Sequence, residues 1–462
     1  MTLFPRAGAA FTARCPARAT LTLLAAATLL PLGAGTAAAQ LGSYNAPPGP
    51  AGVYAIRNAR LVVVSGPTIE NGTIVIGRDG RIQALGANVP VPADAQTIDG
   101  TGMTVYPGMM DAGTTLGLAE IPQGAAATMD VAELGSFNPN VQAFFGINPH
   151  SAHVGVTRVV GVTHVVSRPT GGILSGQAAL INLAGDTPQQ MALARSVALV
   201  VNLPRAGFAG RGFGGGGQAA TSTQDAERMR ARQLDSLRQM LRDAAAYATA
   251  HEAFAKDAAL PRPARDVVLA ALGPAMRGEV PVIFTADRAG DIRAALDFAR
   301  DEKLKAIILG GREAPAVAER LRQQDVPVVL TEVLALPSRE DDPYDVNFST
   351  PATLAAAGVR FAISSGNDGS SARDLPYVAG MAAAFGLSKE EALKAVTLYP
   401  AQIFGVGDQL GSLQVGKVAN LAVLTGDMLE ATSDTKALFV GGRPVPLSSK
   451  HTYLNEMFKD RP

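Results

Sequence analysis

Histidines are the first residues to examine for chemistry, because the imidazole ring binds metal ions and titrates near neutral pH. His150 and His153 have an H-x-x-H spacing in NPHSAHVG, which at the start of a helix could place both rings on one face. No acidic residue shares this spacing, so a surface or structural role is the alternative to metal binding. His164 lies in an apolar run, which indicates a core histidine or one at the site end of a strand. His251 and His451, on a polar helix and in the C-terminal tail, are expected to be solvated.

Charged and polar residues directly follow three apolar runs, and the carboxyl ends of parallel strands usually carry the sites of α/β proteins. We expect these residues to form a polar, mixed-charge rim that binds a small zwitterionic, amide or peptide-like ligand. The candidates are Asp287 with Arg288, Arg312 with Glu313, and Asn367, Asp368 and Arg373. The alternative is that the charges at 287–288 and 312–313 only stabilise helix starts through the helix dipole.

The elements that must position these residues are apolar strands alternating with helices. The run VPVIFTA at 280–286 precedes a predicted helix near 288–301, and further strands are predicted at 304–310, 326–331 and 360–365. Strand and helix in succession, with each strand apolar throughout, predict a buried parallel sheet with right-handed crossovers. The other predicted elements are strands at 157–167, 177–183 and 196–203 and helices at 225–250, 312–324, 374–386 and 388–398.

Short alternating β-runs flank this body at both ends. In 53–105 they are broken by Asn71-Gly72, Asp79-Gly80 and Asp99-Gly100, which predicts a series of hairpins. The stretch 405–447 returns to short β-runs with glycine turns. We therefore predict one small β-sandwich from 53–105 and 405–447, an α/β barrel from 106–404 and a tail at 448–462.

The glycine-rich segment 207–224 does not predict a phosphate-binding loop. It contains no GxxxxGK[ST] motif and no strand-to-helix turn, and no paired acidic residue accompanies it. We expect a flexible surface loop between a strand and the arginine-rich helix 225–250.

Residues 1–39 resemble a secretory signal peptide. Arg6, Arg14 and Arg18 precede a short apolar run, and the small residues 37–39 suit a cleavage site that leaves Gln40 first. A Pro/Gly linker at 40–52 follows. Cys15, the only cysteine, would leave with this segment, which excludes disulfides and thiol chemistry in the mature chain. The expected location is the periplasm or the medium.

Composition narrows the partners of the mature chain. Loss of the three leader arginines from 40 basic and 40 acidic residues leaves a formal charge of about −3, which does not favour nucleic acid or an anionic membrane surface. No later run has transmembrane length. A 47% apolar chain of about 420 residues suits one large barrel with a small satellite.

The segment VYPGMMDAGTTLG at 105–117 resembles the first barrel strand of the amidohydrolase superfamily, in which a PG-apolar-apolar-D-x-H-x-H run supplies two metal ligands. Other segments resemble the same family in the same order along the chain, in particular its exported imidazolonepropionase-like members. These segments are 161–185, 284–299, 309–321, 364–406 and 411–427.

This resemblance implies a (β/α)8 barrel that hydrolyses carbon–nitrogen bonds other than ordinary peptide bonds. In the family, histidines from strands 1, 5 and 6, a lysine or glutamate after strand 4 and an aspartate after strand 8 surround a metal that activates water. Here Asp111 keeps its family position and Asp368 could serve as the strand-8 aspartate, so we assign catalytic roles to Asp111, Asn367 and Asp368. The histidine positions carry Gly113, Thr115, Thr285 and Gly310 or Gly311, and Asn420 replaces a turn aspartate in the satellite sheet.

Two hypotheses follow from this resemblance. The first is a hydrolase with an altered metal site, in which Thr115, Thr285, Asp287, Glu313 and Arg373 contact the substrate. The second is a non-catalytic homologue that binds a ligand or supports an active amidohydrolase subunit. A loop-bracing role is the alternative for Asp111. No metal ligand and no cofactor are predicted, although a divalent ion such as zinc stays open, as does assembly as a homo-oligomer or with a paralogous subunit.

Overall fold

The computed structural model describes residues 45–121, 126–204 and 223–461. The predicted signal peptide at 1–39, the linker up to residue 44 and the glycine-rich segment up to residue 222 lie outside these ranges. Residues 45–52 contain neither helix nor strand. Among the described residues, no helix combines the length and apolarity needed to cross a bilayer.

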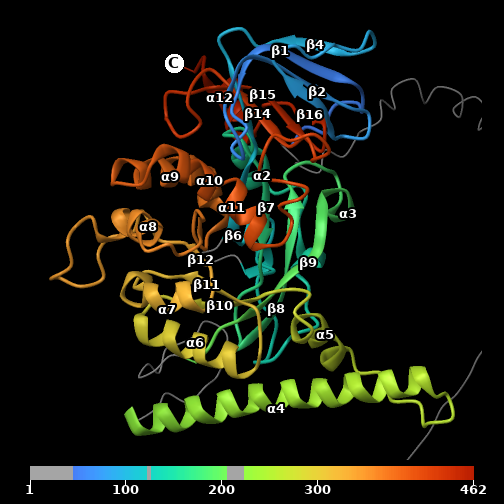
Figure 1. The fold of residues 1–462 in the computed structure, drawn as a ribbon, viewed down its shortest axis with the longest axis vertical. Helices are drawn as coiled ribbons and strands as arrows, with labels where there is room; N and C mark the ends of the chain where they lie inside the picture. Colours follow the sequence, from blue (N-terminus) through green and yellow to red (C-terminus); the bar gives the residue numbers. More distant parts are fainter. Residues whose placement is uncertain (1–44, 122–125, 205–222, 462) are drawn as a thin grey trace, which may run out of the picture. The chain divides into compact units, whose positions relative to one another are not determined.

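Strands from both ends of the chain meet, as the sequence predicted, but they form one eight-stranded sheet where a small β-sandwich was predicted (Figure 1). Its order is β16-β15-β14-β5-β1-β2-β3, with β4 paired to β1. Asp79-Gly80 lies in the turn between β2 and β3, but Asn71 lies inside β2 with a φ of 51°, so the hairpin predicted at Asn71-Gly72 is wrong. The strands are β1 Tyr54–Leu61, β2 Ile69–Ile76, β3 Ile82–Gly86, β4 Gln96–Asp99, β5 Thr104–Pro107, β14 Leu421–Leu424, β15 Thr435–Val440 and β16 Arg443–Pro444.

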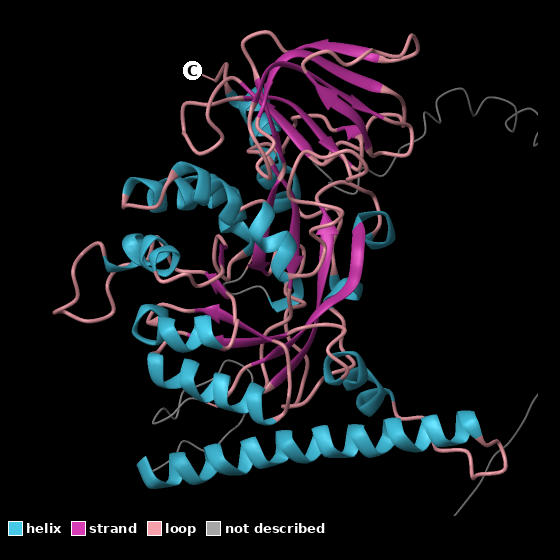
Figure 2. Cartoon of the chain, in the orientation of Figure 1, coloured by secondary structure: helices cyan, strands magenta, loops and turns pink. Residues whose placement is uncertain are grey.

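A second eight-stranded sheet, in chain order from β6 to β13, forms the barrel. Figure 2 shows strands of this sheet with helices beside them. The pairs from β9 to β13 are parallel, as predicted, whereas β8 runs antiparallel to both β7 and β9. Every residue of β8 is buried, including Ser175, Gln177 and Asn182, and burial on both faces of a strand does not encode its direction. The strands are β6 Met109–Thr114, β7 Val162–Ser167, β8 Leu174–Asn182, β9 Ala192–Val201, β10 Val282–Ala286, β11 Ala306–Gly310, β12 Val328–Leu330 and β13 Phe361–Ile363.

Helices cover the outside of the parallel half of the barrel, where α6 to α10 are stacked beside β10 to β13 (Figure 1). The predicted helices appear close to their expected positions, but residues 157–158 end α2 rather than begin a strand. The helices are α1 Ala143–Gly146, α2 Ala152–Arg158, α3 Pro188–Met191, α4 Thr223–Lys256, α5 Val267–Met276, α6 Ala289–Asp301, α7 Ala318–Gln323, α8 Val346–Ala356, α9 Leu375–Ala384, α10 Lys389–Ala395, α11 Leu398–Ile403 and α12 Lys450–Phe458, with 3-10 turns η1 Ala126–Thr128, η2 Ala314–Val317 and η3 Gly369–Asp374.

The barrel interior is filled by aliphatic side chains from neighbouring strands. Ile283, Ile307, Leu309, Val329 and Ala362 belong to one buried cluster, in which β10 to β13 contribute similar positions. Alternate residues of a strand face the same side. The next inward-facing residue of each strand after this layer therefore lies nearer the carboxyl end of the barrel. The interior is therefore a packed core, and any site must lie above it.

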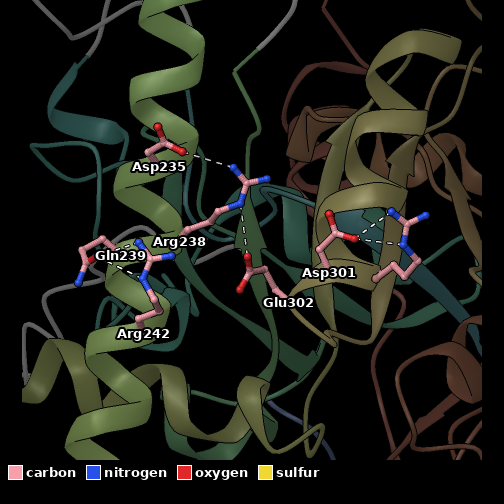
Figure 3. A network of polar contacts seen from close by, with 7 residues as sticks. Asp235, Arg238, Gln239, Arg242, Asp301 and Glu302 are labelled. Atoms are coloured by element: carbon pink, nitrogen blue, oxygen red, sulfur yellow. Dashed lines mark hydrogen bonds and ion pairs between the residues drawn. The ribbon is translucent and has the colours of Figure 1, made fainter.

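The 34-residue helix α4 is attached to the barrel through one face. Leu237, Leu241 and Ala244 are buried at the helical spacing that places them side by side. Figure 3 shows Arg238 reaching from α4 to Glu302 just after α6, with 3.4 Å between Nε and the carboxylate. The same guanidinium lies 5.5 Å from the centre of the Phe298 ring. Arg238 therefore joins α4 to the end of α6.

We predict that Arg238→Ala loosens α4, because it removes an ion pair and a cation–π contact, together about 1 kcal/mol. Hydrogen–deuterium exchange should show faster uptake across 223–256. The control is Arg242→Ala on the same helix, whose guanidinium bonds only to Gln239 among the described residues (Figure 3). Equal uptake in the two variants would contradict the anchoring role.

Candidate functional site

Asp111 joins the two edge strands of the barrel sheet. Its carboxylate is fully buried on β6 and accepts hydrogen bonds from Ser364 Oγ at 2.6 Å and from Ser365, through both backbone N at 3.3 Å and Oγ. The backbone N of Gly113 adds a fourth bond at 3.2 Å. Because Ser364 and Ser365 directly follow β13, these contacts link β6 to β13 at the carboxyl end of the barrel.

A buried arginine accompanies this carboxylate. Arg168, which directly follows β7, is 3% exposed, and burial lowers the pKa of its guanidinium to about 10 while the charge of Asp111 opposes that shift. Burial raises the pKa of Asp111 despite its four hydrogen bonds. Each group therefore offsets part of the cost of burying the other's charge.

Asn367 completes this central network. Its side-chain oxygen accepts a hydrogen bond from Arg168, and its backbone oxygen accepts one from Thr115 Oγ1 at 2.9 Å. Three predicted site residues, Asp111, Thr115 and Asn367, thus meet in the network formed with Arg168, Ser364 and Ser365, which we call the central network. Arg168, Ser364 and Ser365 were not predicted from the sequence, although each lies within two residues of the end of a strand.

The positions expected to supply metal-binding histidines are crowded. A Cβ on Gly113 would lie 2.8 Å from Leu309 and 3.9 Å from Arg168 Nε. A Cβ on Gly310 would lie 2.3 Å from the Asp287 carboxylate, and one on Gly311 would lie 2.4 Å from Val328. Both Gly310 and Gly311 also have positive φ, at 110° and 72°, which disfavours any larger residue.

Thr285 stands where strand 5 would present its histidine. Thr285 lies two residues after Ile283, which belongs to the interior cluster, so its side chain points to the same face of β10 as that of Ile283. Its Oγ1 is buried and has no hydrogen-bond partner among the described residues. Thr285 therefore offers one hydroxyl, but no imidazole nitrogen, to this region.

The histidines do not assemble a metal centre in the described part of the chain. His150 is exposed before α2, and His153 Nε2 lies 3.0 Å from the backbone oxygen of Glu120. His251 packs against Tyr247 on α4 with ring centres 4.2 Å apart, and His451 is exposed on α12. Across residues 45–121, 126–204 and 223–461, no three His, Cys, Asp or Glu side chains are arranged to hold a metal ion.

His164 is a core histidine, one of the two alternatives that the sequence left open. It is fully buried on β7, with Nδ1 2.7 Å from Thr163 Oγ1 and 3.4 Å from Asn420 Nδ2. Asn420 also donates to Asn182 Oδ1 at 2.8 Å and accepts from Gly441 N at 2.7 Å, so it joins the barrel to the small sheet. Burial lowers the pKa of His164 to about 3, which keeps this ring neutral.

A polar cavity of about 660 Å³ lies where β10, β11 and β12 end. It brings together the two predicted pairs, Asp287 with Arg288 and Arg312 with Glu313, and adds Asp291, Glu332, Ser338 and Arg339. We call it the mixed-charge cavity, and its lining residues are Asp287, Arg288, Asp291, Arg312, Glu313, Glu332, Ser338 and Arg339. The Glu313 carboxylate also accepts a hydrogen bond from the backbone N of Ala289 at 2.9 Å. It thereby pairs one of the backbone N–H groups that the start of α6 leaves without a helical partner.

Two predicted site residues take surface positions. Asp368 is exposed and caps η3 by accepting from Ser370 N at 2.9 Å. Arg373 is exposed, with its Nε 3.7 Å from the carboxylate of the adjacent Asp374. Neither residue lines the mixed-charge cavity. Their catalytic and substrate-binding roles stay predictions.

Comparison with known proteins identifies relatives along most of the chain. Residues 311–445 match the family described as "Amidohydrolase family". An imidazolonepropionase from Acidiphilium cryptum is 27% identical over 414 residues, covering 85% of this chain and 96% of that protein. An amidohydrolase of known structure from Thermotoga maritima is 23% identical with a TM-score of 0.74, covering 85% of this chain and 99% of that one. A putative prolidase from Bifidobacterium longum is 19% identical with a TM-score of 0.52, covering 88% and 99%.

We predict that Asp111→Ala destabilises the fold by about 3 kcal/mol or more, because it leaves the Ser364 and Ser365 hydroxyls without their acceptor and the buried Arg168 charge without a nearby anion. Urea unfolding of the purified protein measures this change. Asp368→Ala removes an exposed capping carboxylate and should cost only about 1 kcal/mol. Equal losses in the two variants would show that Asp111 does not join the strands.

We predict that His164 makes the fold acid-sensitive. Below about pH 6.5 an unfolded histidine binds a proton, but the buried ring does not until about pH 3, so stability is lost as the pH falls between these values. Between pH 7.5 and 5 this histidine should cost about 2 kcal/mol, a loss that His164→Gln would not show. His451→Gln, at an exposed position, should keep the wild-type slope of unfolding free energy against pH. Identical slopes for all three proteins would refute the assignment.

Proposed function

Because this chain belongs to the amidohydrolase superfamily, we propose that it binds a small amide- or peptide-like molecule at its barrel mouth without the family's metal-assisted hydrolysis. The observation that carries this proposal is the Arg168 guanidinium, which lies buried beside the Gly113 position in a network with Asp111 and Asn367. A fixed cation at this point disfavours a second cation nearby.

The residues do not fit the family's zinc centre. Glycines and threonines occupy the histidine positions, and Leu309, Val328 and the Asp287 carboxylate crowd the places where larger side chains would project. Structural and catalytic zinc sites need three or four nitrogen, sulfur or carboxylate ligands in tetrahedral geometry. We therefore assign no step to a metal.

A second candidate function is metal-independent cleavage of a carbon–nitrogen bond. It is favoured by the contact of Ser365 Oγ with Asp111, because a carboxylate that accepts a hydroxyl proton can activate that hydroxyl as a nucleophile. The half-buried position of Ser365 is compatible with approach of a substrate. The absence of a third orienting group in the described central network makes this candidate weaker than ligand binding.

The proposed function extends to the location of the protein and to its partner chains. We propose that the mature chain, beginning at Gln40, works in the periplasm or medium. There it would act as a homo-oligomer or beside a paralogous, active amidohydrolase subunit. A pull-down from the periplasm with the mature chain, analysed for an amidohydrolase partner, tests this assembly.

We predict that the purified protein contains far less than one zinc per chain and hydrolyses no member of a cyclic-amide and dipeptide panel. Metal analysis and product detection measure these outcomes, and EDTA should leave the melting temperature unchanged because no structural metal is lost. Stoichiometric zinc would overturn the proposal. Activity that survives EDTA but disappears in Ser365→Ala would instead support the second candidate.

A further inference from the structure

Four charged groups of the mixed-charge cavity form two ion pairs. Arg312 contacts Glu332 and Ser338, and Arg339 Nη2 lies 2.9 Å from Glu313 Oε1. These pairs offset their own charges and hold the loop after β12 against the loop after β11. They are therefore walls of the cavity rather than free ligand-binding charges.

Arg288 and Asp291 belong to neither pair. Both line the cavity, and neither has an ion pair or a side-chain hydrogen bond with any described residue. Arg288 is the N-cap residue of α6 and Asp291 lies in its first turn, three residues further on, so one rigid helix start presents both charges. The start of α6 thus presents one cation and one anion to the cavity, with Arg288 exposed and Asp291 half-buried.

We propose that the mixed-charge cavity binds a compact zwitterion of dipeptide size, with the ligand carboxylate on Arg288 and its ammonium group on Asp291. This inference rests on the proposed ligand-binding function and specifies its ligand class. A singly charged ligand would leave Arg288 or Asp291 uncompensated as the cavity is desolvated, which is costly. A zwitterion satisfies both groups at once.

The dimensions and surroundings support this class. A volume of about 660 Å³ falls within the range usual for small-molecule sites and exceeds what a dipeptide requires. A guanidinium can hold a carboxylate through two parallel hydrogen bonds, which makes Arg288 a specific carboxylate partner. The helix start that carries it is fixed by the bond from Ala289 N to Glu313, so little ordering is needed on binding.

Isothermal titration of the purified protein with three probes tests the two charges separately. Glycylglycine carries both charges, N-acetylglycylglycine lacks the ammonium group, and glycylglycine amide lacks the carboxylate. We expect glycylglycine to bind and each blocked probe to bind about tenfold more weakly or worse, because each loses one charge-assisted contact. Absence of glycylglycine binding, or equal binding of a blocked probe, would overturn the inference.

Substitutions then assign each charge to its partner. Arg288→Gln should weaken glycylglycine binding about tenfold and abolish the preference over glycylglycine amide. Asp291→Asn should also weaken glycylglycine binding about tenfold, and it should abolish the preference for glycylglycine over N-acetylglycylglycine. The matched control is Arg293→Gln, which removes an exposed arginine of α6 that does not line the cavity.

Two results would overturn the assignment. One is an equal effect of Arg288→Gln and Arg293→Gln on glycylglycine binding. The other is an Asp291→Asn variant that keeps its discrimination against the acetylated probe. Melting curves should show that all three variants fold, because the substituted side chains have no partners in the described fold. Zinc content and hydrolysis are measured independently of these titrations, so failure here leaves the proposed loss of metal chemistry standing.

Discussion

The buried carboxylate of Asp111 is the interaction on which the carboxyl end of the barrel depends. The barrel sheet has β6 and β13 as its edge strands, and Asp111 joins them by accepting hydrogen bonds from both serines that follow β13. A charge at this depth costs several kcal/mol unless it is bonded and compensated. Four hydrogen bonds and the nearby Arg168 guanidinium supply that compensation, so the closure of the barrel and the content of its centre are coupled.

Arg168 determines what this centre can bind. Its guanidinium extends from the end of β7 to Asn367 after β13 and lies against Gly113 on β6. Leu309, 2.8 Å from where a Cβ on Gly113 would lie, already fills the space beside this glycine, and Arg168 Nε lies 3.9 Å from the same point. Glycines and threonines at the positions of the family's histidines are the basis for the proposal of ligand binding without metal chemistry.

The mixed-charge cavity lies to one side of this centre, above the parallel half of the barrel. Its walls are pairs such as Arg312 with Glu332, whereas its free charges come from the start of α6. The parallel arrangement of β10 to β12 places the three loops that carry these residues on one face. A strand running in the opposite direction, as β8 does, would send its following loop to the other end.

The amino-acid sequence determined the alternation of strands and helices, the meeting of β-runs from both chain ends and the placing of Asp287 and Glu313 on one face, but it left His164 open between the core and a strand end and predicted a sandwich where one sheet forms. The features that it determined follow from local periodicity and from the rule that parallel strands end on the same face. Only the tertiary structure decided the direction of β8, the surface position of Asp368 and the joining of Asp111 to Ser364 across 253 residues. The physical reason is that burial on both faces of a strand carries no direction and a carboxylate carries no record of its distant partner. Arg168 shows the same limit, because the sequence does not record that the arginine after β7 meets Asn367 after β13.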